Sequence, residues 1–234
     1  MFVWKSEKGG NASLTRYARK EHNKNIMSNT DLKYADRGMV FEPGRHASVR
    51  LEDGVSVARG KLHEVCGNGS LGFVACLVGL VEGPVIWVGY KGQRATLNPD
   101  GLAAFFDPSR LIMVRGLNRA DVLWAGEQAL RHRGAGCVVM ELGDGPDLRE
   151  SRRLQIAAEE GGALGLAILR GRAQTSAAHM RWQCEAQNNR DYPARWDITK
   201  SKDGQRGSWR VRYTNRVRGE NAPGLVSLAS ASAA

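Results

Sequence analysis

The stretch Lys61–Leu80, KLHEVCGNGSLGFVACLVGL, decides the fold class of this 234-residue chain. Its first five residues, Lys61–Val65, are typical of a strand, Gly67–Gly72 form a glycine-rich turn, and the apolar residues that follow predict a helix. In α/β proteins, the turn between a strand and the next helix is a place where phosphate groups bind. The stretch therefore predicts an α/β fold with a candidate nucleotide site at this turn.

Strand patterns separated by helical patterns continue as far as residue 169. The strands are expected at 84–88, 110–114, 137–140 and 164–169. Asn118 is expected to cap one helix, and Asp147 with Glu150 resembles the capping box of another, which ends at Gly161-Gly162. Strands separated by helices need crossover connections, and these build a parallel sheet. The pattern therefore predicts a mostly parallel sheet flanked by helices.

The pattern changes after Gly171. Alternating residues predict three further strands, at 179–184, 195–199 and 208–213. Lys202-Asp203-Gly204 supplies turn-forming residues between the last two strands, so residues 194–213 are expected to form a β-hairpin. We expect the sheet to continue into this part of the chain as an antiparallel extension.

The glycine-rich turn matches two phosphate-binding motifs and completes neither. As G-x-G-x-x-G, it lacks the acidic residue expected about 20 residues later, because Glu82 precedes the next strand. As G-x-x-x-x-G-K-[ST], it has Phe73 and Val74 in place of the lysine and the hydroxyl that stabilise phosphate charge and bind Mg²⁺. We therefore predict a vestigial nucleotide site without catalysis or cofactor, while a plain tight turn explains the same glycines equally well. The vestigial site would consist of Gly67, Gly69 and Gly72.

Other catalytic and metal-binding patterns are missing from the sequence. The four cysteines contain no C-x-x-C pair, and none of the five histidines lies at a ligand-like spacing from a cysteine or another histidine. Glu141 is either a Walker-B-like carboxylate or, as is commoner, a solvated acid at the end of a strand. His63 and Glu64 are either an acid–base pair or, again the commoner case, ordinary polar residues at a strand end. We therefore expect neither enzymatic activity nor a metal site.

The net charge of +10 is concentrated at the two ends of the chain. Residues 1–38 carry eight basic and four acidic residues, residues 39–170 carry fifteen of each, and residues 171–234 carry eleven and five. Basic ends around a neutral core favour contact with an anionic partner, most often nucleic acid, although solvated tails are the alternative. The expected segments are a basic, disordered segment at 1–38, an α/β core at 39–170, a basic β extension at 171–218, and a disordered Ala/Ser-rich tail at 219–234.

The sequence also bears on the compartment. The apolar stretch from Leu71 to Tyr90 is interrupted at Glu82-Gly83-Pro84, after 11 residues, whereas a membrane span needs about 20. The cysteine spacing does not suit a disulfide scaffold, which favours a reducing compartment. We expect a cytoplasmic protein that does not contact a membrane.

Several ordered segments resemble the ImuA family, and in particular its short alphaproteobacterial branch. The segments are Leu62–Gly67, Gly83–Trp87, Leu97–Leu102, Asp107–Leu111, Leu123-Trp124 with Glu127–Arg131, Arg152–Glu159, and Arg181-Trp182. The resemblance implies a RecA-like core in an SOS-response protein that works in translesion DNA synthesis. It also implies two partners, an inactive Y-family polymerase relative and an error-prone C-family DNA polymerase. A SulA-like inhibitor of cell division and a nucleotide-binding ATPase of the RecA superfamily remain alternatives.

The basic C-terminal strands are a candidate surface for single-stranded DNA. Arg181, Arg210 and Arg212 lie close in sequence to tryptophans, and DNA-binding surfaces combine cations with aromatic rings in this way. In the alternative interpretation, Trp182, Trp196 and Trp209 pack onto the sheet while the arginines face water. We predict DNA contact at the three arginines.

Overall fold

The computed structural model describes residues 48–51, 55–92, 97–213 and 226–230. All of them belong to one compact unit, residues 41–234. The basic segment predicted at 1–38 lies outside the described residues, as does most of the tail predicted at 219–234.

Strands and helices alternate along the described chain from β3 to β7. The strands are β1 (Ser48–Arg50), β2 (Ser56–Ala58), β3 (Lys61–Cys66), β4 (Val85–Tyr90), β5 (Leu111–Gly116), β6 (Cys137–Leu142), β7 (Leu164–Leu169), β8 (Met180–Ala186), β9 (Ala194–Ser201), β10 (Ser208–Tyr213) and β11 (Val226–Ser230). The helices are α2 (Ser70–Gly79), α3 (Pro99–Leu102), the 3₁₀ helix η3 (Pro108–Arg110), α4 (Arg119–Arg131) and α5 (Leu148–Gly161).

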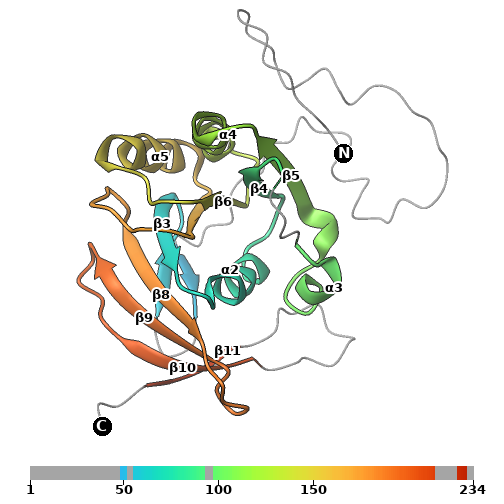
Figure 1. Cartoon of the computed structure of the whole chain (residues 1–234), viewed down its shortest axis with the longest axis vertical. Coiled ribbons are helices and arrows are strands. Elements are labelled where there is room, and N and C mark those ends of the chain that lie inside the picture. Colours follow the sequence, from blue (N-terminus) through green and yellow to red (C-terminus); the bar gives the residue numbers. More distant parts are fainter. Residues whose placement is uncertain (1–47, 52–54, 93–96, 214–225, 231–234) are drawn as a thin grey trace, which may run out of the picture. The chain divides into compact units, whose positions relative to one another are not determined.

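Nine of the described strands form one sheet, in the order β11-β10-β9-β8-β3-β7-β6-β4-β5 (Figure 1). Neighbouring strands from β8 to β5 are parallel, and those from β8 to β11 are antiparallel. The chain passes from β3 through α2 to β4, yet β7 and β6 lie between these two strands in the sheet. This arrangement confirms the predicted α/β, RecA-like fold with a mostly parallel sheet and a C-terminal antiparallel hairpin.

Local capping residues set the helix boundaries where the sequence predicts them. The side chain of Asn118 accepts a hydrogen bond from the backbone N–H of Asp121 at the start of α4. Asp147 and Glu150 form the reciprocal bonds of a capping box at the start of α5. Gly162 ends α5 with a φ of +77°, a conformation that favours glycine. These predictions are confirmed.

The sheet separates two hydrophobic cores. One core contains α2 together with β1 and β2, and the other contains α4 and α5 on the opposite face (Figure 1). The C-terminal strands extend the first core, because the side chains of Trp182, Trp196 and Trp209 lie in it. The opposite side of β9 and β10 carries exposed arginines instead. This side of the sheet is therefore available for contacts.

The C-terminal strands differ from the prediction in two respects. β8 pairs in parallel with β3, so the antiparallel part of the sheet begins only at β9. The segment 226–230 forms β11 beside β10, within the tail predicted as disordered. β11 can pair with β10 because an edge strand offers unpaired backbone groups to any segment that can reach it. β8 is parallel to β3 because residues 170–179 carry the chain from the end of β7 back to the start of the sheet, where Met180 pairs with His63.

Candidate functional site

The turn between β3 and α2 spans only Gly67–Gly69, because β3 ends at Cys66 and α2 begins at Ser70. Gly67 has a φ of +93°, which favours glycine. A Cβ atom on Gly67 would lie 2.1 Å from the carbonyl oxygen of Cys184 in β8. The N–H of Gly69 donates a hydrogen bond of 2.9 Å to the same oxygen. The turn is therefore packed directly against the backbone of β8.

Asn68 and Gly72 make further contacts with the C-terminal strands. The Asn68 side-chain oxygen accepts a hydrogen bond of 2.7 Å from the backbone N–H of Ala186. Gly72 lies in the first turn of α2, where a Cβ atom would be 2.6 Å from the hydroxyl oxygen of Tyr213 in β10. The three glycines of the predicted vestigial site thus lie where the C-terminal strands leave little or no room for a side chain.

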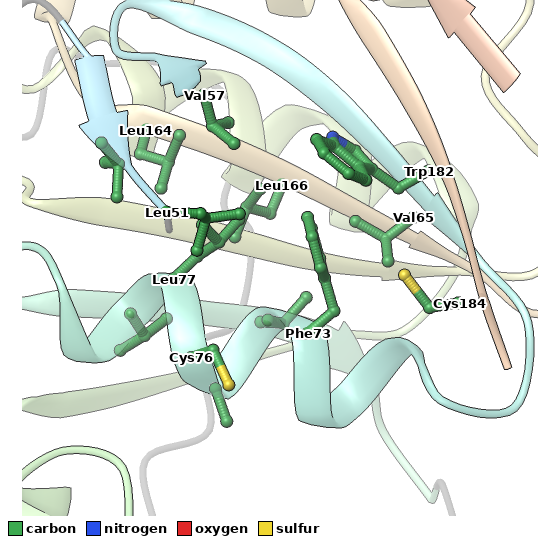
Figure 2. Close-up of a cluster of buried hydrophobic side chains, with 14 of the residues drawn as sticks. Leu51, Val57, Val65, Phe73, Cys76, Leu77, Leu164, Leu166, Trp182 and Cys184 are labelled. Carbon is green, nitrogen blue, oxygen red and sulfur yellow. The ribbon is translucent and has the colours of Figure 1, made fainter. Parts of the chain in front are cut away.

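Phe73 and Val74, which occupy the motif's lysine and hydroxyl positions, are fully buried. The centre of the Phe73 ring lies 4.8 Å from the ring of Trp182 and 4.8 Å from that of Trp196. Figure 2 shows Phe73 rising from α2 toward the sheet, beside Trp182 and Val65. Both side chains therefore belong to the hydrophobic core that joins α2 to the C-terminal strands.

Glu141 at the end of β6 is buried, with only 4% of its surface exposed. Its Oε1 atom accepts a hydrogen bond of 2.6 Å from the indole N–H of Trp87. Its Oε2 atom accepts one of 3.2 Å from the guanidinium of Arg170. The interpretation of Glu141 as a solvated acid was therefore wrong, because a tryptophan and an arginine from neighbouring parts of the sheet hold its carboxylate.

His63 and Glu64 are both fully buried and point to opposite faces of the sheet, as successive strand residues do. The Nε2 atom of His63 lies 2.8 Å from the carbonyl oxygen of Ala58. Glu64 instead accepts a hydrogen bond of 2.7 Å from Nε of Arg181. Burial lowers the pKa of His63 to about 4. The two residues form no acid–base pair, and neither is an ordinary exposed residue at a strand end.

Arg210 and Arg212 lie on the exposed side of β10, while Trp209 and Val211, the two neighbours of Arg210, point into the core. The guanidinium carbons of Arg210 and Arg212 lie 4.7 and 5.0 Å from the centre of the Tyr192 ring, within the range of a cation–π contact. Nε of Arg212 also donates a hydrogen bond of 3.0 Å to the carbonyl oxygen of Asp191. Within the part of the chain that the structure describes, neither guanidinium forms an ion pair.

A third arginine, Arg195 in β9, lies directly opposite Arg210. Its Nε atom donates a hydrogen bond of 3.1 Å to Asp197 on the same strand. Like charges directly opposite each other destabilise a sheet. The stability of the sheet therefore does not explain why arginines occupy both positions. We call Arg195, Arg210, Arg212 and Tyr192 the arginine face.

The predicted DNA-binding residue Arg181 is not part of the arginine face. It pairs with Lys200 near the start of β8, whereas Arg210 and Arg195 lie level with Glu185 near its end. Its guanidinium is held by the buried carboxylate of Glu64. The tryptophans follow the alternative interpretation, since Trp182, Trp196 and Trp209 are all buried.

Comparison with known proteins identifies relatives of the chain. No protein-family model matches it. Two curated proteins, each named Protein ImuA, from Caulobacter vibrioides strains NA1000 / CB15N and ATCC 19089, are 31% identical to the chain. The matched region covers 72% of this chain and 81% of each relative. The chain belongs to the ImuA family. The resemblance expected from the ordered sequence segments is thereby confirmed.

The described residues of this ImuA-family chain offer neither a metal-binding cluster nor, at three of the four cysteines, a reactive thiol. They contain no group of three or more His, Cys, Asp or Glu residues that could hold a metal ion. Burial raises the pKa of the Cys137 thiol to about 12 and also raises those of Cys76 and Cys184, which makes these thiols poor nucleophiles. None of the described helices has the length and apolar character needed to cross a bilayer.

Sequence reasoning missed two members of the arginine face in this ImuA-family chain. Arg195 alternates with the buried Trp196, so the two-residue period of a strand could have placed it on the exposed side. Tyr192 lies in the loop between β8 and β9, and no sequence pattern predicts its contact with Arg210 and Arg212 in β10.

Proposed function

We propose that this ImuA-family chain is a non-catalytic accessory protein of SOS-induced, error-prone translesion DNA synthesis. It acts in the cytoplasm by binding a polymerase-like partner and single-stranded DNA. The observation that carries the proposal is the packing of the glycine turn against β8, in a chain that is 31% identical to Protein ImuA.

The proposed absence of catalysis is supported by the contacts of the glycine turn. A phosphate-binding turn needs backbone N–H groups that point toward the anion and space for the phosphate oxygens beside them. Here the N–H of Gly69 is bonded to Cys184, and the same carbonyl leaves no room beside Gly67. Phe73 lies in the core and supplies no positive charge. These contacts support a vestigial site in which the C-terminal strands lie against the turn.

The proposed partners are those that the family resemblance implies. They are an inactive Y-family polymerase relative and an error-prone C-family DNA polymerase. Co-purification of the tagged chain with the polymerase relative, together with a loss of damage-induced mutations when the chain is deleted, would support the role. Filamentous cells on overexpression, without co-purification, would overturn it in favour of a division inhibitor.

The arginine face is the proposed contact with single-stranded DNA. Two guanidinium groups without an ion pair among the described residues are held by one aromatic ring, so they are positioned to meet adjacent phosphates. Arg181 adds positive charge near the other end of β8, although Glu64 shares its guanidinium. The exposed side of β9 and β10 is where an extended strand of DNA would lie.

The salt dependence of DNA binding tests this contact. Each phosphate contact on a single strand contributes about 0.7 to the slope of log affinity against log salt, so Arg210→Gln/Arg212→Gln should lower the slope by about 1.4. The matched control is Arg149→Gln/Arg152→Gln, which removes two exposed arginines from α5 and should leave the slope unchanged. Equal losses in both variants would show that binding depends only on net charge and would remove the arginine face from the proposal.

A further inference from the structure

The outward side of α4 and α5 is a second surface with unusual residues. Three ion pairs hold the two helices side by side and parallel, namely Arg119–Glu150, Glu127–Arg153 and Arg131–Glu160. The inward residues of both helices lie in the core with β6 and β7. The outward residues therefore form one surface. It is rigid because the sheet packs against both helices and the ion pairs join them to each other.

Large apolar side chains occupy this surface. Ile156 is 38% exposed and lies opposite the buried side of α5, which contains Leu154, Ala157 and Ala158. Trp124 is 49% exposed on α4, and Leu148 is 58% exposed at the start of α5. Amphipathic helices of a stable domain normally carry polar residues at such positions. Exposed apolar residues that cluster on one face mark sites of protein contact.

Three arginines lie on the same side of α5 as Ile156. Arg149, Arg152 and Arg153 lie seven, four and three residues before Ile156, so they share its side of α5. Arg149 lies in the first turn of the helix, where a positive charge opposes the helix dipole and costs stability. In the described part of the chain, neither Arg149 nor Arg152 has an ion-pair partner. The ion pairs of the fold therefore do not account for these two cations.

We propose that this surface binds an acidic, amphipathic segment of a partner protein. The surface consists of Trp124, Leu148, Arg149, Arg152, Arg153 and Ile156, and we call it the α4–α5 surface. Because Arg149 and Arg152 have no ion-pair partner among the described residues, we expect the bound segment to supply carboxylates. The exposed apolar side chains of the surface favour apolar residues in the bound segment as well, and a nucleic-acid backbone does not offer these. Trp and Arg are also the residue types that contribute most to protein interfaces.

The ligand class can be tested with the purified full chain and a library of random 16-residue peptides. We expect the selected peptides to combine Asp or Glu with large apolar residues. Arg149→Glu/Arg152→Glu should weaken the best peptide at least about tenfold, and Ile156→Ser should weaken it severalfold, because each removes part of the central contact. Binding should also change the tryptophan fluorescence, because Trp124 is 49% exposed, and this change should be absent in Trp124→Phe, which keeps the other five tryptophans.

The arginine face provides the matched control. Arg210→Gln/Arg212→Gln should bind the peptide as tightly as the unchanged chain, and all variants should unfold at similar temperatures, because every substituted residue is exposed. Three results would overturn the proposal: selection of basic or uncharged peptides, peptide binding that survives Arg149→Glu/Arg152→Glu, or displacement of the peptide by a dT oligonucleotide. Self-association that is lost in the same variant would also overturn it, in favour of a second copy of the chain. Neither the peptide affinity nor its loss depends on the proposed DNA contact.

Discussion

Replacing Gly67 with alanine tests whether the glycine turn is a packing contact between β3, α2 and β8. The turn has two features that exclude a side chain at this position. Gly67 has a φ of +93°, and a Cβ atom would lie 2.1 Å from the carbonyl oxygen of Cys184. The matched control is Gly204, which has a φ of +74° in the β9–β10 turn and nothing within 4 Å of its Cβ position. Both glycines carry the conformational cost, and only Gly67 carries the steric cost.

The expected loss of stability follows from these two terms. The left-handed conformation costs about 1 kcal/mol for alanine, and this is the whole effect expected for Gly204→Ala. At Gly67, β8 must move by roughly 1 Å to reach an ordinary contact distance, which costs about 1–3 kcal/mol as overpacking. That movement also weakens the Gly69–Cys184 hydrogen bond, which contributes about 1 kcal/mol. Gly67→Ala should therefore lower the free energy of unfolding by about 4 kcal/mol.

Urea unfolding of the three proteins measures the difference. We expect the midpoints of Gly204→Ala and of the unchanged chain to be close, and that of Gly67→Ala to be much lower with a similar slope. Equal effects of the two substitutions would refute the reasoning, because they would mean that β8 does not press on the turn. A stable Gly67→Ala variant would show the same.

Two further predictions concern the buried residues around the turn. Phe73→Lys/Val74→Thr restores both side chains of the phosphate-binding motif, yet we expect it to add no ATP binding. It should lower the free energy of unfolding by about 4 kcal/mol, because it places a cation between Trp182 and Trp196. A stable variant that binds ATP would contradict this prediction. Burial lowers the pKa of His63 in the folded chain to about 4, whereas in the unfolded chain it lies near 6.5. The unfolded chain therefore binds the proton first as the pH falls, so His63 should cost about 2 kcal/mol of stability between about pH 7 and about pH 5. Urea titrations at the two pH values should show a smaller loss in His63→Phe, and an identical loss would contradict the assignment.

Local features of the fold could be predicted from the sequence. Asn118 and the Asp147–Glu150 capping box act within three or four residues, so their patterns are sufficient to place the starts of α4 and α5. The alternation of Trp and Arg in β10 likewise has a period of two and indicates which side of the strand is buried. This is why Arg210 and Arg212 could be placed on the exposed side without a structure, although Arg195, which follows the same period in β9, was missed.

Features that depend on distant partners could not be predicted. The burial of Glu141 depends on Trp87 and Arg170, which lie 54 and 29 residues away in the sequence. The glycines of the turn are spaced like a phosphate-binding motif, and only the structure places the backbone of Cys184 beside them. A spacing of glycines indicates where backbone must be close to something, and it does not indicate whether that neighbour is a phosphate or another strand.

Binding of a fluorescent ATP analogue to the full chain, in the presence of Mg²⁺ and of single-stranded DNA, tests the absence of nucleotide chemistry most directly. We predict no saturable binding at micromolar concentrations of the analogue and no release of phosphate above that of the Gly67→Ala variant. Micromolar, Mg²⁺-dependent binding with turnover that Gly67→Ala abolishes would contradict the account, because it would show that the turn opens away from β8 to hold a triphosphate.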